Sequence, residues 1–363
     1  MDAYKVSNET LDELLDKPAD ISVNLYIYIV PIFILACLIT FFMNLIVILA
    51  IPMISHVSRM TKPYLIFVLS LVISDAFASL LLGFQLLMGS YLPIVHGTYW
   101  NTCLLLISEG LKLAGVIVTV FHLLVMVMIH LAGVLNPVKF KEFLTQTVAK
   151  TSVCILWFVP FAGILVSFSA LPEQGFRSQN CEEHQFLSEI TFRSVFSGLI
   201  VFPTIAILLL YGYFHSILWQ RQTSVSSISR QNIRASKITF LIMFTCTLGW
   251  IPAVANTLLI CSEGCRFQPS DLSPNALFGL HAIGNILVIF KSFSNPIIFA
   301  FRQANIRRSV HQLGCYMFCC RRVSKVNLAR TSSHTHSSKR FLRTSNRESS
   351  SRHPSSKRFS SKS

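Results

Sequence analysis

The chain has 363 residues, of which 52% are hydrophobic and only 13% are charged, and its mean hydropathy is +0.57. These values exclude an ordinary soluble domain, whose surface must be mostly polar, and indicate a protein that lies largely in lipid. The formal net charge is +15, but most of the excess follows Arg302, outside the apolar segments. A basic tail beside membrane spans meets anionic lipid first, so nucleic-acid binding is not expected.

The first 24 residues are acidic and lack the basic start of a cleaved signal peptide, so the first apolar segment is expected to remain as an anchor. Residues 1–24 also contain the sequon Asn8-Glu9-Thr10, which makes Asn8 a candidate glycosylation site if this segment faces outward.

Roughly seven apolar stretches follow, each long enough to cross a bilayer as a helix. They are Leu25 to Ile51, Pro63 to Met88, Cys103 to Val134, Thr151 to Leu171, Ser194 to Trp219, Ile238 to Ile260 and Asn275 to Phe301. Glu109 and Lys112 interrupt the third stretch; they are three residues apart, so they share a helix face and can pair near the headgroups or line a cavity. The sequence predicts an all-α membrane protein, a seven-transmembrane helix bundle over residues 25–301.

Basic residues near the span ends predict the orientation. They gather in the loops after spans one, three and five and in the tail, whereas the other loops are richer in acidic residues. The N-terminus is therefore expected outside the cell and the C-terminus in the cytoplasm, in a multi-pass protein of the plasma membrane.

Polar and helix-breaking residues inside spans are costly, so each is a functional hypothesis. They are Asn44, Asp75 in "LSLVISD", Trp157, Pro203 and Tyr211, Trp250 and Pro252 in "GWIP", and Asn295, Pro296 and Phe299 in "NPIIF". In this order the chain resembles the rhodopsin-like G-protein-coupled receptors along its whole length except the termini. For Asn44 and Trp157, simple helix packing is an equally good explanation.

The resemblance implies a receptor that passes ligand occupancy to a heterotrimeric G protein and to arrestin, with Pro252 and Pro296 as hinges. No metal cluster, nucleophile triad or phosphate loop is visible in the sequence, so neither an enzyme nor a cofactor is expected. A transporter is a poorer fit, because no paired internal repeat is found.

Lys291 changes the chemistry that the resemblance implies at Asp75. Asp75 resembles the acid of the sodium pocket that the family has at this position. Thr119, Ser292 and Asn295 are candidates for the other oxygens of such a pocket. Lys291 stands where the family usually has an asparagine, so its ammonium is expected to pair with Asp75 and to replace sodium. One alternative is a lysine turned toward a watery cavity. A retinal Schiff base is a second, although the opsin lysine lies six residues before the asparagine of the Asn-Pro pair and Lys291 only four.

Three positions depart from the family pattern. Where the family has Asp/Glu-Arg-Tyr, the text before Pro137 places His130, so the arginine is absent and His130 can do less. Phe299 replaces a tyrosine, and Cys246 stands where a phenylalanine is usual. These departures favour an alternative function, an atypical receptor, decoy or scaffold that activates G protein poorly.

The resemblance also implies a disulfide between Cys103 and Cys181 on the oxidising side. Cys261 and Cys265 either form a second, short bridge or remain free thiols. The aspartate that receptors for amines carry in span three is absent, which favours a peptide ligand. The candidates that line an outer cavity are Glu109, Lys112, Phe202, Trp250, Asn256, Thr257, His281 and Asn285.

Residues 302–320 predict an amphipathic helix on the inner leaflet, in contact with membrane lipids. The cysteines that end it are Cys315, Cys319 and Cys320, which are either palmitoylation sites or unmodified thiols. Residues 321–363 are basic and serine-rich and are expected to be disordered. Phosphorylation there would create a docking surface for arrestin; a merely solvated tail is the alternative.

Overall fold

The computed structural model describes residues 20–54, 62–221, 227–261, 264–302 and 304–317. Asn8, Cys319, Cys320 and the tail from residue 321 lie outside the described residues. The chain divides into two units, Met1–Val310 and His311–Ser363. Within the described residues there is no β-strand, only an isolated bridge between Ile260 and Phe267, so the prediction of an all-α protein is confirmed.

Seven long helices form the first unit. They are α2 (Asp20–Ala50), α3 (Lys62–Gln85), α5 (Thr102–Leu135), α7 (Gln146–Ala170), α8 (Ile190–Arg221), α9 (Ser227–Leu259) and α10 (Pro274–Arg302). The shorter helices are α4 (Leu92–His96), α6 (Pro137–Phe143) and α11 (Ala304–Met317). The remaining helical turns are η2 (Ile51–Met53), the π-helical η3 (Leu86–Tyr91), η4 (Gly175–Arg177), η5 (Gln179–Cys181), η6 (Gln185–Leu187) and η7 (Pro269–Asp271).

Six of these helices are long and apolar enough to cross a membrane, counted over the described residues alone. The seventh, α9, begins at Ser227, ahead of the predicted start at Ile238, because the polar segment "SISRQNIRASK" is helical as well. Its apolar part follows this segment, and Phe244–Leu259 is apolar among the described side chains. The bundle contains all seven predicted helices in the predicted order.

Local side chains fix where the spans begin and end. Asn101 caps α5 by accepting a hydrogen bond from Leu104 N, and Thr145 caps α7 by accepting one from Val148 N. Gly97 ends α4 with a φ of 61°, a left-handed conformation that glycine adopts without steric cost. These caps place the third and fourth spans within a few residues of the boundaries that the apolar pattern predicts.

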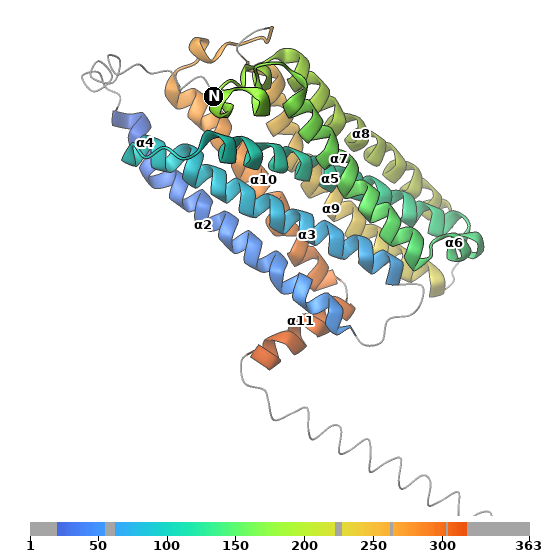
Figure 1. Ribbon diagram of the computed structural model, residues 1–363. Helices are drawn as coiled ribbons and strands as arrows, with labels where there is room; N and C mark the ends of the chain where they lie inside the picture. The colour runs from blue at the N-terminus through green and yellow to red at the C-terminus, as the bar shows by residue number, and fades with distance from the viewer. Residues whose placement is uncertain (1–19, 55–61, 222–226, 262–263, 303, 318–363) are drawn as a thin grey trace, which may run out of the picture. The chain divides into compact units, whose positions relative to one another are not determined.

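The helices pack as a closed bundle with α5 in the interior (Figure 1). α2 contacts α3 and α10, α10 contacts α9, and α9 contacts α8, while α5 contacts α3, α7, α8 and α9. Accordingly 61% of the apolar window of α5 is buried, against 17% for α7, which contacts fewer neighbours. The polar residues of the third span are thus the ones most shielded from lipid.

Candidate functional site

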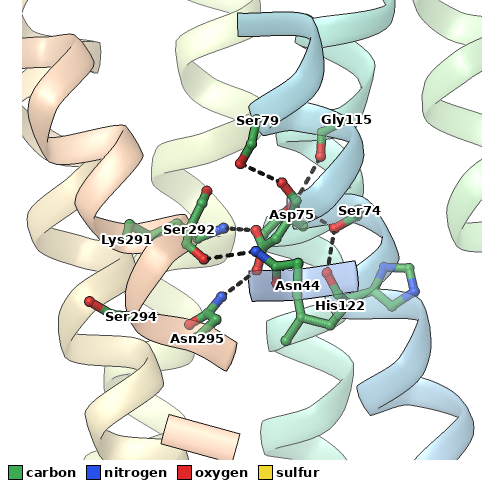
Figure 2. Close-up of polar contacts among 12 residues, drawn as sticks. Asn44, Ser74, Asp75, Ser79, Gly115, His122, Lys291, Ser292, Ser294 and Asn295 are labelled. Carbon is green, nitrogen blue, oxygen red and sulfur yellow. Dashed lines mark hydrogen bonds and ion pairs between the residues drawn. The ribbon is translucent and has the colours of Figure 1, made fainter. Parts of the chain in front are cut away.

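The centre of the bundle holds an ion pair between α3 and α10 (Figure 2). Lys291 Nζ lies 2.5 Å from Asp75 Oδ1, and the two side chains are 1% and 0% exposed. Asn295 Nδ2 donates to the other carboxylate oxygen, Asp75 Oδ2, at 2.5 Å. The ion pair that the sequence predicts is present, and Lys291 does not face a watery cavity.

A buried pair of this kind is sensitive to the loss of either member. Desolvating two charges costs several kcal/mol each, and their attraction offsets this only when geometry is good and the remaining lone pairs are satisfied. Here both carboxylate oxygens of Asp75 accept hydrogen bonds from α10. The arrangement therefore makes the contact between α3 and α10 dependent on two adjacent turns of α10.

A third helix, α2, adds Asn44 to these residues, and Asn44, Asp75, Lys291 and Asn295 together are called the polar seam. Pro296 has no N–H, so the carbonyl of Ser292, four residues earlier, loses its helical donor. Asn44 Nδ2 donates to that carbonyl at 3.2 Å and to the Thr40 carbonyl at 2.9 Å. The amide of α2 thus satisfies the backbone group that the proline in α10 frees, which explains why both residues occur together.

Two of the oxygens expected around Asp75 are engaged elsewhere. Thr119 donates to the Gly115 carbonyl at 3.0 Å and is hydrogen-bonded to Ser74 at 2.8 Å. Ser292 meets the seam through its backbone carbonyl. The expectation that Thr119 and Ser292 contact Asp75 is therefore wrong, and the partners of its carboxylate are Lys291 and Asn295.

A second polar chain joins α7, α3 and α5, and the sequence reasoning did not include two of its members. Trp157 Nε1 donates to Ser70 Oγ at 2.8 Å, and Ser70 Oγ lies 2.7 Å from His122 Nε2. His122 Nδ1 lies 2.8 Å from the Val118 carbonyl. These contacts fit a neutral imidazole with its proton on Nδ1, so that Ser70 donates to Nε2. An imidazole in mid-span was the signal that could have identified His122.

At the end of the bundle where α5 begins, Glu109 accepts two hydrogen bonds on one oxygen. Lys112 Nζ donates to Glu109 Oε2 at 2.7 Å, and Gln85 Nε2 of α3 donates to the same oxygen at 2.5 Å. The side chains of Lys112 and Glu109 are 25% and 16% exposed. The π-helical segment η3 begins directly after Gln85. π-Helical segments often occur at functional sites, and this pair keeps unused hydrogen-bonding capacity on both members.

The other residues predicted to line a ligand cavity differ in their partners and in their exposure. Asn256 donates across to the Leu280 carbonyl at 2.9 Å, whereas Thr257 bonds within its own helix to the Ala253 carbonyl. Trp250 is buried, Asn285 is half-buried and His281 is exposed.

Phe202 is 77% exposed on the outer surface of α8, so the prediction that it lines a cavity is wrong. Successive residues of a helix point about 100° apart, and the next residue, Pro203, is buried. Phe202 therefore faces the lipid side of the bundle.

Two disulfides and an arginine connect the helices and loops at this same end of the bundle. Cys103 is bonded to Cys181, and Cys261 to Cys265. Arg193 of α8 donates to the carbonyls of Ile260 and of Leu187, the latter at 3.0 Å. The loop after α7 also contains a hollow of about 340 Å³, whose lining is wholly polar and mostly charged: Glu173, Arg177, Ser178, Gln179, Glu182 and Glu183.

The opposite end of the bundle contains two of the three positions that depart from the family pattern, His130 and Phe299. The ring of His130 packs edge-on against Tyr64 of α3 at 5.2 Å, and His130 Nε2 is buried without a hydrogen-bond partner. Phe299 is fully buried in the main apolar core. Tyr211 of α8 lies beside Phe214, with ring centroids 6.2 Å apart.

The first helical turns after α10 belong to α11. In it Ile306 is buried, whereas Arg307 and Arg308 are exposed. In the second unit, Cys315 lies one turn from His311, with Sγ 3.7 Å from Nδ1.

Comparison with known proteins agrees with this architecture. The family model described as 7 transmembrane receptor (rhodopsin family) matches residues 43–299. Adenosine receptor A2b of Homo sapiens is 22% identical over 226 residues, which cover 55% of this chain and 66% of that protein. Cannabinoid receptor 2 of Homo sapiens is 26% identical over 198 residues, 48% of each chain. The chain thus spans about half to two thirds of the length of these relatives.

The matched region runs from the residue before Asn44 to Phe299 and so includes the whole polar seam. These relatives are receptors and not enzymes, which agrees with the absence of catalytic motifs from the sequence. The chain therefore belongs to the rhodopsin family of seven-transmembrane receptors and is a multi-pass membrane protein.

Proposed function

We propose that this receptor detects an extracellular peptide and passes that signal to a cytoplasmic G protein by rearranging α9 and α10 against α3. The observation that supports this proposal most is the Asp75–Lys291 pair, which joins α3 to α10. Lys291 Nζ also lies 5.9 Å from the centre of the Trp250 ring of α9, and Lys291 precedes Pro296 by somewhat more than one helical turn. A ligand changes such a bundle only to the extent that it binds one of its two states more tightly. Prolines inside α9 and α10 offer places where those states can differ.

The proposed ligand site lies at the outer end, between α3, α5 and the loop after α7. Glu109 and Lys112 are only partly buried. If they give up their mutual contact, Glu109 can bind a cationic group of a ligand and Lys112 an anionic one. The polar hollow in the loop after α7 suits a basic peptide segment. The relatives are named for adenosine and for cannabinoids, so a small molecule is the competing ligand class.

We place the N-terminal segment and the two disulfides outside the cell, and the loops after α2, α5 and α8 in the cytoplasm. The basic residues of those loops and the oxidising environment that disulfides need support this orientation in the plasma membrane. The proposed boundaries are residues 25–301 for the receptor domain, 302–320 for a palmitoylated amphipathic helix and 321–363 for an arrestin-binding tail. Cys315 is the described member of the proposed palmitoylation site.

His130 supports a second candidate function, a receptor that binds ligand but activates G protein weakly. Its ring is packed against Tyr64 and its Nε2 is buried without a hydrogen-bond partner, so it offers no positive guanidinium at the cytoplasmic end of α5. Arrestin recruitment or pairing with another receptor would then carry the output.

Screening separates these functions. Cells that express the full chain, or the chain with His130→Arg, are exposed to peptide, amine and lipid panels, and G-protein activation and arrestin recruitment are both measured. We expect a peptide to activate the natural chain and His130→Arg to raise the G-protein signal about tenfold or more, as one buried charge-assisted hydrogen bond of about 1.5–3 kcal/mol allows. A Lys112→Met variant should lose the response to that peptide at equal surface expression. Activation by a lipid or nucleoside alone would contradict the peptide proposal.

A further inference from the structure

The stem of Lys291 lies against a glycine of α9. A Cβ added to Gly249 would lie 2.8 Å from Lys291 Cβ, 3.3 Å from Lys291 Cγ and 3.2 Å from the Leu287 carbonyl. Carbon atoms do not approach to 2.8 Å without a shift of one partner, and two of these three atoms belong to backbone or to the first side-chain carbon of α10. Only glycine therefore allows α9 to lie this close to α10 at the level of Lys291.

Lys291 connects its own helix to two others. Its backbone belongs to α10, its ammonium pairs with Asp75 of α3, and the same nitrogen lies 5.9 Å from the centre of the Trp250 ring of α9. A cation within about 6 Å of an indole face is attracted to it. Because Trp250 follows Gly249 directly, the position of one turn of α9 determines both the room for the lysine stem and the aromatic surface beside its charge.

We propose that Gly249 is a positioning residue for the buried ion pair. It sets the separation of α9 and α10 that lets Lys291 reach Asp75, and the pair thereby couples any outward movement of α9 to α3. This role requires neither a particular ligand nor a particular transducer, so its failure would leave the proposed receptor function untouched.

The same helix pair offers a matched control at Gly284 of α10. A Cβ added there would lie 3.7 Å from Asn256 Nδ2 and 4.0 Å from Ala253 Cα, which are ordinary contacts. Alanine has a higher helix propensity than glycine at both positions, so a loss of stability at residue 249 alone must come from its neighbours.

The experiment compares melting temperatures of the purified full chain in lipid nanodiscs. Gly249→Ala and Gly284→Ala are each made in the natural chain and in a background without the ion pair, Asp75→Asn with Lys291→Met, in which residue 291 keeps its Cβ and Cγ. We expect Gly249→Ala to lower the melting temperature by about 5 °C in the natural chain and by less than half as much in the other background. Gly284→Ala should change it by no more than about 2 °C in either.

An equal loss in both backgrounds would show that Gly249 matters for packing only, and it would overturn the proposal. So would a loss at Gly249 no larger than that at Gly284. If Gly249→Ala prevents folding of the natural chain, folding in the background without the pair supports the proposal, and failure in both backgrounds contradicts it. Spin labels on the cytoplasmic ends of α5 and α9 give a second readout: their separation should increase in Gly249→Ala and remain unchanged in Gly284→Ala.

Discussion

Replacing Lys291 with methionine should lower the free energy of unfolding by about 3–5 kcal/mol, the usual loss when one partner of a buried ion pair is removed. Methionine keeps an unbranched apolar stem of similar length, so the change removes the charge with little change in packing. Asp75 would be left fully buried with Asn295 as its only partner from α10. Thermal melting of the purified chain, and the fraction that reaches the cell surface, measure the loss.

The double variant Asp75→Asn/Lys291→Met separates charge from packing. Without either charge, no uncompensated ion remains in the core, and Asn295 can still hydrogen-bond to an amide at residue 75. The double variant should therefore regain most of the stability that Lys291→Met loses. A single variant as stable as the natural chain, or a double variant no better than the single one, would show that the pair is not the feature that joins α3 to α10.

Removing the Cys103–Cys181 disulfide should have the second largest effect. In the chain-entropy treatment the stabilisation grows with the length of the closed loop. The two cysteines are 78 residues apart, whereas Cys261 and Cys265 are 4 apart. Cys103→Ser should therefore cost about 4.5 kcal/mol and Cys261→Ser only about 2 kcal/mol.

Both disulfide variants are measured by chemical denaturation of the purified chain, with the natural chain under reducing conditions as the reference. Each variant should resemble the partly reduced protein that lacks the same bond. A cost for Cys261→Ser that equals or exceeds that of Cys103→Ser would contradict the loop-length argument, and would point to the contacts of Arg193 with the Ile260 carbonyl as a further source of stability.

The spans and the ion pair were predictable because each depends on a strong physical constraint. About twenty apolar residues must be helical in a bilayer, and a lysine and an aspartate in the core of a bundle must find one another. Span boundaries in the structure differ from the predicted ones by a few residues, except at α9, which begins at Ser227 because the polar segment before Ile238 is helical as well. Asn44 could have been assigned to the Ser292 carbonyl from the sequence as well, since Pro296 leaves that acceptor without a donor.

The detailed partners around the pair were not predictable from order alone. Thr119 bonds to Ser74 and to the Gly115 carbonyl, local partners that the order of residues along the chain does not reveal. The prediction for Phe202 was wrong because the depth of a residue along its helix does not determine the direction in which its side chain points. The contact of Gly249 with Lys291 depends on the separation of two helices, a quantity that no pattern within either helix contains.

The counter-cation of Asp75 is a residue of the chain, Lys291, and not a sodium ion. The melting temperature of the purified natural chain is measured in sodium chloride and in potassium chloride at equal ionic strength, beside that of a Lys291→Asn variant. We expect the same melting temperature in both salts for the natural chain, and stabilisation by sodium only in Lys291→Asn. Selective stabilisation of the natural chain by sodium, abolished by Asp75→Asn, would contradict it.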